Sequence, residues 1–416
     1  MENQQQPTAE ILSPAGDMER FRAAVDFGAN AVYLAGTEFG MRSAPSNFNL
    51  EELNSAVAYA HNRGVKVYLT CNTLPRNEEI GRLPDFLKET AQAGVDAFII
   101  SDIGVLGLAK QAAPQVDIHI STQAGIVNYQ TARAFWEMGA SRVVLARELS
   151  LEEIAEIRVK TDPCMEIEAF VHGSMCVSFS GRCLISNYLT GRDANRGDCA
   201  QPCRWKYYLM EESRPGQYFP VVEQPEGTYF FNSRDLCMIE HIPALLNAGV
   251  TSLKIEGRAK SAYYVAVITN AYRHALEDYQ KENGGWKLRP WIWEEVNKIS
   301  HREYCTGFFF KNQPGQVYHN GGYIREYEVV AMCDRYEDGV AYLSQRNRFF
   351  RGDTLDVLEP GGEPFSIAAD ELYDRNRDPI ESAPHAMQRI LMPTKRPIMP
   401  GAFLRKKREQ VGFKTF

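Results

Sequence analysis

The sequence predicts an α/β protein whose main part is a TIM-type (β/α)8 barrel. Eight apolar, β-rich runs alternate with helical stretches over about 250 residues, which is the order and length of such a barrel. A connection of about eighty residues between the seventh and eighth runs is far longer than a usual loop and carries five of the nine cysteines. From about residue 320, short alternating runs separated by Gly and Asp turns predict a small C-terminal β-barrel domain.

The eight predicted strands share a pattern. They are EILSPAG, FGANAVYLAG, RGVKVYLTCN, AGVDAFIISD, DIHISTQ, MGASRVVLAR, MEIEAFVHG and AGVTSLKIEG. Little alternation of apolar and polar residues indicates strands buried on both faces, which is typical of parallel sheets. Five glycines suit the left-handed position after a helix, namely Gly28, Gly64, Gly94, Gly139 and Gly249. The alternative is a doubly wound open sheet, which is less well supported because no Gly-rich phosphate fingerprint follows the first run.

Helix starts and domain limits follow from local signals. Asn49 with Glu52 and Ser150 with Glu153 have the spacing of capping boxes. We expect residues 1–312 to form the TIM-like barrel domain, with a cysteine-rich insertion over 172–250 after the seventh strand. A helical extension over 259–312 contains the amphipathic stretch YYVAVITNAYRHALEDY. Residues 320–416 are expected to form the small β-barrel domain, with RNA binding as one possible role.

Composition limits the class of protein. With 416 residues, 44% apolar residues and a net charge of -7, the chain should be packed and globular. The charge disfavours a strongly basic nucleic-acid wrapper but leaves room for a local basic face. The first residues do not resemble a signal peptide, and the apolar runs are too short to span a bilayer, so we expect a cytoplasmic protein without membrane contact. Thiols stay reduced in the cytoplasm, so clustered cysteines suggest a metal or catalysis rather than disulfides.

Four cysteines form the pattern C-x6-C-x15-C-x3-C at Cys176, Cys183, Cys199 and Cys203. Structural zinc usually takes two tight pairs, and here only the second pair is tight. An iron–sulfur cluster tolerates irregular spacing, so the pattern favours a cluster, with zinc as the second choice and unligated packing as the third. Cys237 is a candidate fifth member. The other cysteines are expected to be packing residues: Cys71, Cys164, Cys305 and Cys333.

Polar residues at the C-terminal ends of barrel strands are expected to point into the mouth of the barrel. The candidates are Asn72, Asp102, Gln123, Arg147, Glu148, Glu168, His172, Lys254, Glu256 and Arg258. His172, Glu168, Arg147 and Gln123 are the predicted catalytic residues. His172 could act as an acid or base near neutral pH, or only donate a hydrogen bond to the loop.

Substrate binding is predicted for Lys254, Glu256 and Arg258 in the mouth and for Arg348 in the small domain. Arg147, Lys254 and Arg258 could bind the carboxylates of a small anionic metabolite. The alternative for each cation is an internal ion pair with Glu148, Glu168 or Glu256.

The small domain contains the basic and aromatic stretch QRNRFFRGD. Here Arg346, Arg348 and Arg351 alternate with Phe349 and Phe350, a mixture that can stack on exposed RNA bases. A hairpin with buried phenylalanines is the alternative. Near the C-terminus, the run Arg405, Lys406, Lys407 and Arg408 is expected to be a solvated segment or to contact phosphates.

The stretch EAFVHGSMCVSFSGRCLIS resembles the signature of the collagenase-like peptidase family U32, and NSRDL and SLKIEGR fit the same family. The resemblance runs from LSPAGD through the C-terminal domain. It implies a barrel fold and, by the better understood members, an O2-independent hydroxylase of tRNA, ribosomal RNA or ubiquinone precursors. It also implies a 4Fe–4S cluster on Cys176, Cys183, Cys199 and Cys203, with Cys237 behind these four.

The resemblance implies a specific reaction and partners. The implied reaction is hydroxylation of a wobble uridine of tRNA to 5-hydroxyuridine, with prephenate as the source of the hydroxyl group. The implied partners are the anticodon arm, a small anionic metabolite and a paralogous subunit. One alternative is a collagenase-like peptidase, but neither H-E-x-x-H nor G-x-S-x-G occurs, and His172 with Cys176 is a weak nucleophilic pair. The other alternative is a non-catalytic RNA-binding subunit of a paired complex.

Overall fold

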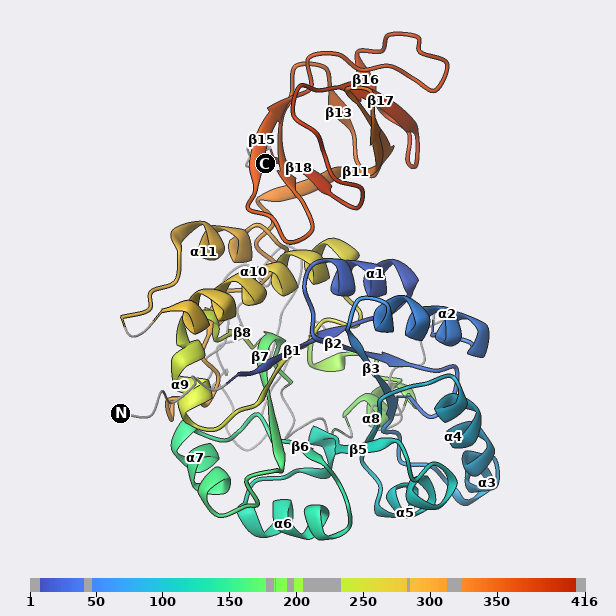
Figure 1. The fold of residues 1–416 in the computed structure, drawn as a ribbon, viewed down its shortest axis with the longest axis vertical. Coiled ribbons are helices and arrows are strands. Elements are labelled where there is room, and N and C mark those ends of the chain that lie inside the picture. Colours follow the sequence, from blue (N-terminus) through green and yellow to red (C-terminus); the bar gives the residue numbers. More distant parts are fainter. Residues whose placement is uncertain are drawn as a thin grey trace, which may run out of the picture.

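The computed structural model describes residues 8–40, 47–176, 183, 185–192, 198–204, 233–282, 285–312 and 323–408. These residues form a barrel surrounded by helices and a smaller β domain at one side of it (Figure 1). Much of the predicted insertion over 172–250, including all of 205–232, lies outside the described residues, as do the junction 313–322 and the last residues 409–416.

Eight parallel strands form the barrel, as the sequence predicts. They are β1 (Glu10–Pro14), β2 (Ala31–Ala35), β3 (Lys66–Cys71), β4 (Ala97–Ile100), β5 (Asp117–Ile120), β6 (Arg142–Val144), β7 (Glu166–Ser174) and β9 (Ser252–Ile255). Strand β1 pairs in parallel with both β2 and β9, and β9 pairs with β7. The ring is therefore closed, the TIM-type barrel is confirmed, and the open-sheet alternative is wrong.

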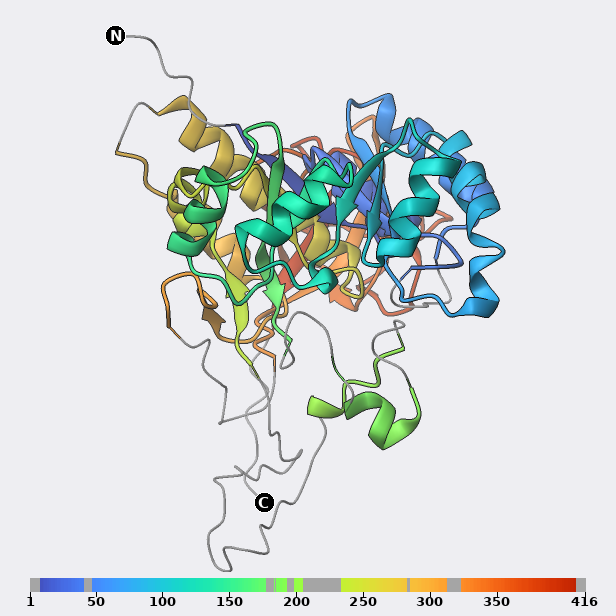
Figure 2. The ribbon, with the colours of Figure 1, turned by 90° about the horizontal axis from the view of Figure 1, so that it is seen from below.

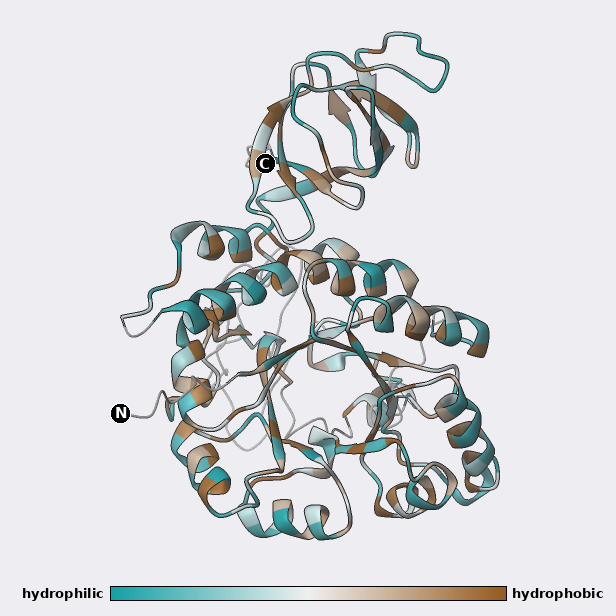
Figure 3. Cartoon of the chain, in the orientation of Figure 1, coloured by the Kyte–Doolittle hydropathy of each residue, from teal (hydrophilic) through white to brown (hydrophobic). Residues whose placement is uncertain are grey.

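Helices cover the barrel, with apolar faces turned toward the strands and polar faces outward (Figure 3). They are α1 (Met18–Asp26), α2 (Leu50–His61), α3 (Asn77–Ile80), α4 (Leu83–Gln92), α5 (Ile103–Ala112), α6 (Tyr129–Glu137), α7 (Leu151–Val159), α9 (Ile242–Asn247), α10 (Ala262–Lys281) and α11 (Pro290–Asn297). Both predicted capping boxes are present, at the starts of α2 and α7. The five helix-terminal glycines all have φ between 70° and 102°, as expected for the left-handed region.

Two short strands that the sequence did not predict lie at the rim beside β7. They are β8 (Asp235–Cys237), antiparallel to the end of β7, and β10 (Tyr304–Cys305), parallel to β8. Gly173 of β7 has φ of 112°, and a Cβ there would lie 2.4 Å from the backbone oxygen of Glu256. Only glycine fits at this point, where β7 passes close to the segment that leaves β9.

The cysteine-bearing segments lie off the end of the barrel to which the strands point. Cys176 comes two residues after β7 ends. The helix α8 (Ile185–Thr190), which follows Cys183, lies beyond this end of the barrel, opposite to the end at which the chain begins (Figure 2). It contacts the short 3-10 helix η4 (Pro202–Arg204), which includes Cys203. The predicted location of the cysteines at the barrel mouth therefore agrees with the structure.

The second domain is an antiparallel sheet around its own core, which confirms the predicted small β domain. The strands are β11 (Tyr327–Glu337), β12 (Val340–Gln345), β13 (Phe349–Phe350), β14 (Thr354–Leu358), β15 (Phe365–Ala368), β16 (Ser382–Ala383), β17 (Arg389–Pro393) and β18 (Phe403–Lys407). Six of them form one sheet in the order β15-β14-β18-β11-β12-β17, and β13 pairs with β16. Most of its buried apolar residues form a cluster separate from that of the barrel, whereas Leu358 and Phe403 pack with the barrel cluster.

A buried ion cluster joins the two domains. The Arg405 guanidinium of β18 lies 2.6 Å from Glu295 of α11 and 3.0 Å from Asp356 of β14, and it donates a hydrogen bond of 2.9 Å to the hydroxyl of Tyr263. Lys298 lies 2.9 Å from the same Glu295. Arg405 is fully buried, so the expectation that this residue belongs to a solvated or phosphate-contacting run is wrong. The cluster fixes the small domain against α10 and α11.

We expect Arg405→Met to destabilise the protein by about 3 kcal/mol, because Glu295 would stay buried with Lys298 as its remaining cation. Denaturant unfolding followed by tryptophan fluorescence measures this loss. The matched control is Arg389→Met, because Arg389 forms a 3.2 Å ion pair with Asp334 at the surface. This substitution should lower the free energy of unfolding by less than about 1 kcal/mol. Equal effects of the two substitutions would contradict the role given to the ion cluster.

Among the helices of the described residues, none has the length and apolar character that crossing a bilayer requires.

Candidate active site at the barrel mouth

Charged side chains fill the lower interior of the barrel. Arg142, at the start of β6, is almost completely buried. Its guanidinium lies 2.6 Å from Glu10, 2.9 Å from Glu168 and 2.7 Å from Glu166. Ser252 donates hydrogen bonds to Glu10 and Glu168 over 3.0 and 3.2 Å. These contacts link β1, β6, β7 and β9 across the barrel, so the arginine holds strands together below the mouth.

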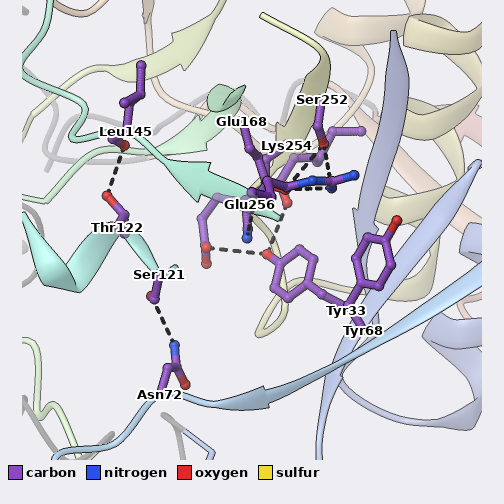
Figure 4. Close-up of polar contacts among 12 residues, drawn as sticks. Tyr33, Tyr68, Asn72, Ser121, Thr122, Leu145, Glu168, Ser252, Lys254 and Glu256 are labelled. Carbon is purple, nitrogen blue, oxygen red and sulfur yellow. Dashed lines mark hydrogen bonds and ion pairs between the residues drawn. The ribbon is translucent and has the colours of Figure 1, made fainter. Parts of the chain in front are cut away.

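Glu168 and Lys254 form a second buried ion pair (Figure 4), and Glu168 joins it to Arg142. The Lys254 ammonium lies 2.6 Å from Oε1 of Glu168 and 4.7 Å from the centre of the Tyr33 ring. Burial raises the pKa of Glu168, but the charges of Lys254 and Arg142 outweigh it and hold this pKa below its usual value. Glu168, which the sequence predicts to be catalytic, and Lys254, which it predicts to bind substrate, therefore form an ion pair with each other. This is the internal ion pair that the sequence offered as the alternative to substrate binding.

Arg147 lies at the mouth itself. Its guanidinium stacks 3.9 Å above the centre of the Phe170 ring and donates a 3.2 Å hydrogen bond to the backbone oxygen of Ser174. The nearest carboxylate oxygen, on Glu256, is 3.9 Å away, and the buried Nε has no hydrogen-bond partner among the described residues. A guanidinium over an aromatic ring, with one ion pair of 3.9 Å within the described part of the chain, can bind a carboxylate or phosphate of a substrate.

Hydroxyl and amide groups form the opposite side of the mouth. The side-chain oxygen of Gln123 accepts hydrogen bonds from Ser101 and Ser121 over 3.2 and 3.5 Å. Arg258, which is 8% exposed, donates a 3.3 Å hydrogen bond to Thr70 at the end of β3. The predicted residues Gln123, Arg147, Glu256 and Arg258 thus share one end of the barrel. Asp102 instead caps the start of α5.

His172 does not point into the mouth. An irregularity in the pairing of β7 with β9 lies between Phe170 and His172, so His172 leaves the inward alternation and packs outside the barrel. Its ring centre lies 5.5–6.0 Å from those of Tyr264, Tyr272 and Tyr304. Burial, His301 and Lys260 lower the pKa of His172 to about 3. This environment does not support an acid or base that titrates near neutral pH, and a catalytic role of His172 stays a prediction.

The four loop cysteines fit a metal centre by donor type. None is in a disulfide, and Cys176 and Cys199 are exposed while Cys183 and Cys203 are half-buried. The backbone N–H of Gln201 lies 3.4 Å from the sulfur of Cys199, and Ala200 donates a hydrogen bond to Ser186 of α8. Yet no three His, Cys, Asp or Glu side chains of the described residues lie within reach of one metal ion. The donor set fits a cluster in type and number, and the four sulfurs would have to come closer together to hold one.

The remaining cysteines are separate from this set. Cys237 is buried among the core residues in β8, and burial raises the pKa of its thiol to about 12. Cys71 and Cys333 are buried as expected. Cys164 is exposed, contrary to the expectation of a packing residue, and lies before the start of β7 at the opposite end of the barrel.

Arg348 is exposed on the small domain and lies apart from the mouth residues. Its guanidinium is 5.4 Å from the centre of the exposed Phe350 ring, and Lys406 approaches the same ring at 5.4 Å. Phe349 is buried, whereas Arg346 forms an ion pair with Glu19 of α1. Of the basic and aromatic stretch, one phenylalanine is therefore a core residue and the other is a surface ring between two cations.

Sequence patterns had not indicated Arg142, Glu10 or Tyr33. The available signal was spacing, because Glu10 and Arg142 stand at strand starts and Glu166 and Glu168 alternate along β7. Charges two residues apart in an otherwise apolar strand share one face. In this closed barrel, the strand face that carries these charges points into the interior, where Arg142 contacts Glu10 and Glu168.

Family models match almost the whole chain. The model described as peptidase family U32 matches residues 16–318, and the model of the family's C-terminal domain matches residues 325–405. The boundary between the two matches falls at the junction between the barrel and the small domain.

The chain is similar to several proteins that are named for the hydroxylation of RNA. The tRNA hydroxylation protein P1 of Bacillus subtilis is 35% identical over 95% of this chain and 94% of its own length. The tRNA hydroxylation protein P of Escherichia coli is 36% identical over 85% of this chain and 86% of its own. The 23S rRNA 5-hydroxycytidine C2501 synthase of Escherichia coli is 40% identical over 74% of this chain and 46% of its own length.

Proposed function

The chain belongs to peptidase family U32, and from this premise we propose that it is an enzyme that hydroxylates a pyrimidine of RNA. The observation that carries the proposal is the likeness to two tRNA hydroxylation proteins over 85% or more of this chain. A relative named for hydroxycytidine synthesis in ribosomal RNA extends the same chemistry to a second pyrimidine. We further propose tRNA as the substrate, with the wobble uridine of the anticodon arm as the target.

Chemistry constrains the co-substrate. Replacing the hydrogen at C5 of uridine by a hydroxyl group removes two electrons from the base. In a reaction without O2, the hydroxyl oxygen must come from another molecule, and an electron acceptor must take up the two electrons. Prephenate is the proposed source of the hydroxyl group, on the basis of the family resemblance. An anionic molecule of this kind suits Arg147, whose guanidinium lies at the mouth and, among the described residues, has a 3.9 Å ion pair to Glu256 as its one ion pair.

The proposed cofactor is a 4Fe–4S cluster on Cys176, Cys183, Cys199 and Cys203. When bound, such a cluster supplies electron transfer. Support comes from four cysteines outside disulfides on segments at one end of the barrel. Zinc on the same thiols is the second choice. The surrounding residues would bind and orient the substrates: Arg147 the anion, and Gln123 with its serine partners a polar group of the base.

The peptidase alternative has little support in the site. A thiol peptidase needs a histidine beside the thiol that titrates near neutral pH. His172 is instead buried among tyrosines with a pKa of about 3, and Cys176 is exposed. A non-catalytic RNA-binding role beside a paralogous subunit remains a prediction, and the next experiment separates it from catalysis.

Deletion of the gene in its own host, together with any paralogue, tests the proposal. We expect 5-hydroxyuridine and its derivatives to disappear from the tRNA fraction, measured by mass spectrometry of nucleosides. Re-expression of this chain alone should restore them if it is the enzyme, whereas a bystander subunit would need its paralogue as well. Unchanged hydroxylated pyrimidines in both the tRNA and the ribosomal RNA fractions would contradict the proposal.

Arg147→Gln should raise the KM for the anionic co-substrate by about tenfold to hundredfold, because a charge-assisted hydrogen-bond donor is lost. Arg147→Lys should recover only part of the affinity, since an ammonium cannot form the two-pronged contact. Steady-state kinetics with varied prephenate measure the effect. Arg133→Gln, an exposed change on α6, is the control. An unchanged KM in Arg147→Gln would show that the anion binds elsewhere.

A further inference from the structure

A cleft of about 700 Å³ runs between the barrel and the small domain. One wall comes from the barrel side, including Glu256, Lys260 and Tyr264. The other wall comes from the small domain, including Tyr327 and Asn347. The buried ion cluster around Arg405 holds the two walls in a fixed relation. The position and shape of the cleft are therefore set by the way the two domains pack.

Positive charge collects at Tyr323 in this cleft. The Lys260 ammonium and the Arg302 guanidinium each lie 4.4 Å from the centre of the Tyr323 ring, and Arg325 lies 5.7 Å from it. In the part of the chain that the structure describes, Lys260 and Arg325 form no ion pair. Arg302 is buried against Asp235, and its Nε lacks a hydrogen-bond partner among the same residues. The cationic group formed by Lys260, Arg302 and Arg325 thus has positive charge that can attract an anion.

Other basic residues of the cleft are already compensated. Arg20 pairs with Asp17, Arg346 lies 2.8 Å from Glu19, and Arg408 lies 3.8 Å from Glu328. The cleft as a whole is therefore close to neutral. Its available charge is local, at Lys260 and Arg325, which suits one or two phosphates of a strand rather than a broad non-specific wrapping of nucleic acid.

The cleft also reaches the mouth. Its lining includes Ser174, two residues before Cys176, and Gln201, which stands between Cys199 and Cys203. Glu256, which lies 3.9 Å from Arg147, belongs to both the mouth and the cleft. A chain-like ligand in the cleft would therefore continue into the mouth and pass the cysteine-bearing segments.

We infer that the interdomain cleft binds a single-stranded segment of the RNA substrate, with backbone phosphates at Lys260 and Arg325. The inference rests on the proposed RNA substrate and adds the place where the strand is held. Aromatic and cationic side chains along a groove are the usual means of holding a single strand without dependence on its sequence. The small domain then has a direct role, since it supplies Arg325 and one wall of the cleft.

The test is binding of a short fluorescein-labelled oligouridine to the full chain, followed by anisotropy over a range of salt concentrations. Lys260→Gln with Arg325→Gln should weaken binding roughly tenfold and lower the slope of log Kd against log salt by about 0.7 for each charge. The matched control is Lys395→Gln with Arg375→Gln, which removes two exposed charges elsewhere on the small domain. Equal losses in the two double variants, or no loss in the first, would overturn the inference.

A second measurement uses the unaltered protein, so folding of a variant is not in question. Photo-crosslinking of a thiouridine-containing oligonucleotide should label peptides that contain Tyr323, Lys260 or Tyr327. Labels confined to peptides outside the cleft would overturn the inference. If the deletion strain loses its hydroxylated nucleoside while the cleft variants bind normally, only this inference fails. If the deletion strain is unchanged, the proposed function fails whatever the cleft binds.

Discussion

Cys176→Ser is expected to abolish hydroxylation, with at least a hundredfold loss of product in complemented deletion cells. Cys176 follows β7 directly, so it is the thiol most closely tied to the barrel. Loss of one thiolate weakens or dismantles a four-cysteine iron–sulfur site. Nucleoside mass spectrometry of tRNA from cells that express the variant measures the result, and iron content of the anaerobically purified variant should fall with it.

The control for this substitution is a cysteine that lies just before the same strand, β7. Cys164 is also exposed, but it stands before the start of β7 at the other end of the barrel. Cys164→Ser should leave both hydroxylation and iron content unchanged. Full activity in Cys176→Ser would contradict the assignment of this thiol, and equal losses in both variants would point to oxidation or misfolding instead of ligation.

Glu168→Gln should destabilise the protein by about 3 kcal/mol at neutral pH, because Lys254 would then be buried without its counter-charge. Glu168 is itself fully buried, so water cannot replace the lost interaction. Denaturant unfolding at pH 7 measures the change. Glu166→Gln is the matched control. Glu166 also lies 2.7 Å from Arg142, but its side chain is 44% exposed, so this substitution should lower the free energy of unfolding by less than about 1 kcal/mol.

The same pair predicts a pH dependence. The charges of Lys254 and Arg142 outweigh burial and hold the pKa of Glu168 below the ordinary value of 4.5. A lowered pKa in the folded state stabilises the protein above pH 4.5, and this contribution is lost as the pH falls through the folded-state pKa. The difference in unfolding free energy between the wild type and Glu168→Gln should therefore shrink on acidification below pH 4.5. A difference that stays constant down to the lowest measurable pH would contradict the assignment.

The barrel could be predicted from sequence because its signals are local and repeated. Strands β2, β3 and β4 are almost continuous apolar runs, and the glycines and capping boxes mark helix ends within a few residues. The strands β8 and β10 escaped prediction because they have three and two residues, too few for any periodicity. Their existence depends on the distant strand β7 with which β8 pairs.

The site was predicted less completely, for a physical reason visible at His172. Strict alternation from Phe170 places His172 inside the barrel, but one irregularity in the pairing moves it to the outer face, among tyrosines of α10 and β10. A shift of one residue reverses the direction of every side chain that follows. No sequence pattern marks such a shift.

Residues far apart in the chain explain the other differences. Whether Arg405 is a surface cation or a buried one depends on Glu295, which is 110 positions away, and the basic run alone could not show this. Similarly, the cleft brings Lys260 to Tyr323 across the boundary of the two domains. The sequence shows which basic residues are present, but their partners follow only from the way the domains pack.

The central claim is that thiolates of the rim segments bind one iron–sulfur cluster. The most direct measurement is the iron and sulfide content of the anaerobically purified chain, together with its Mössbauer spectrum. The account predicts four iron and four sulfide per chain in a 4Fe–4S spectrum, lost when Cys176, Cys183, Cys199 and Cys203 are replaced by serine. Stoichiometric zinc in place of iron, or an iron content that the four replacements leave unchanged, would contradict it.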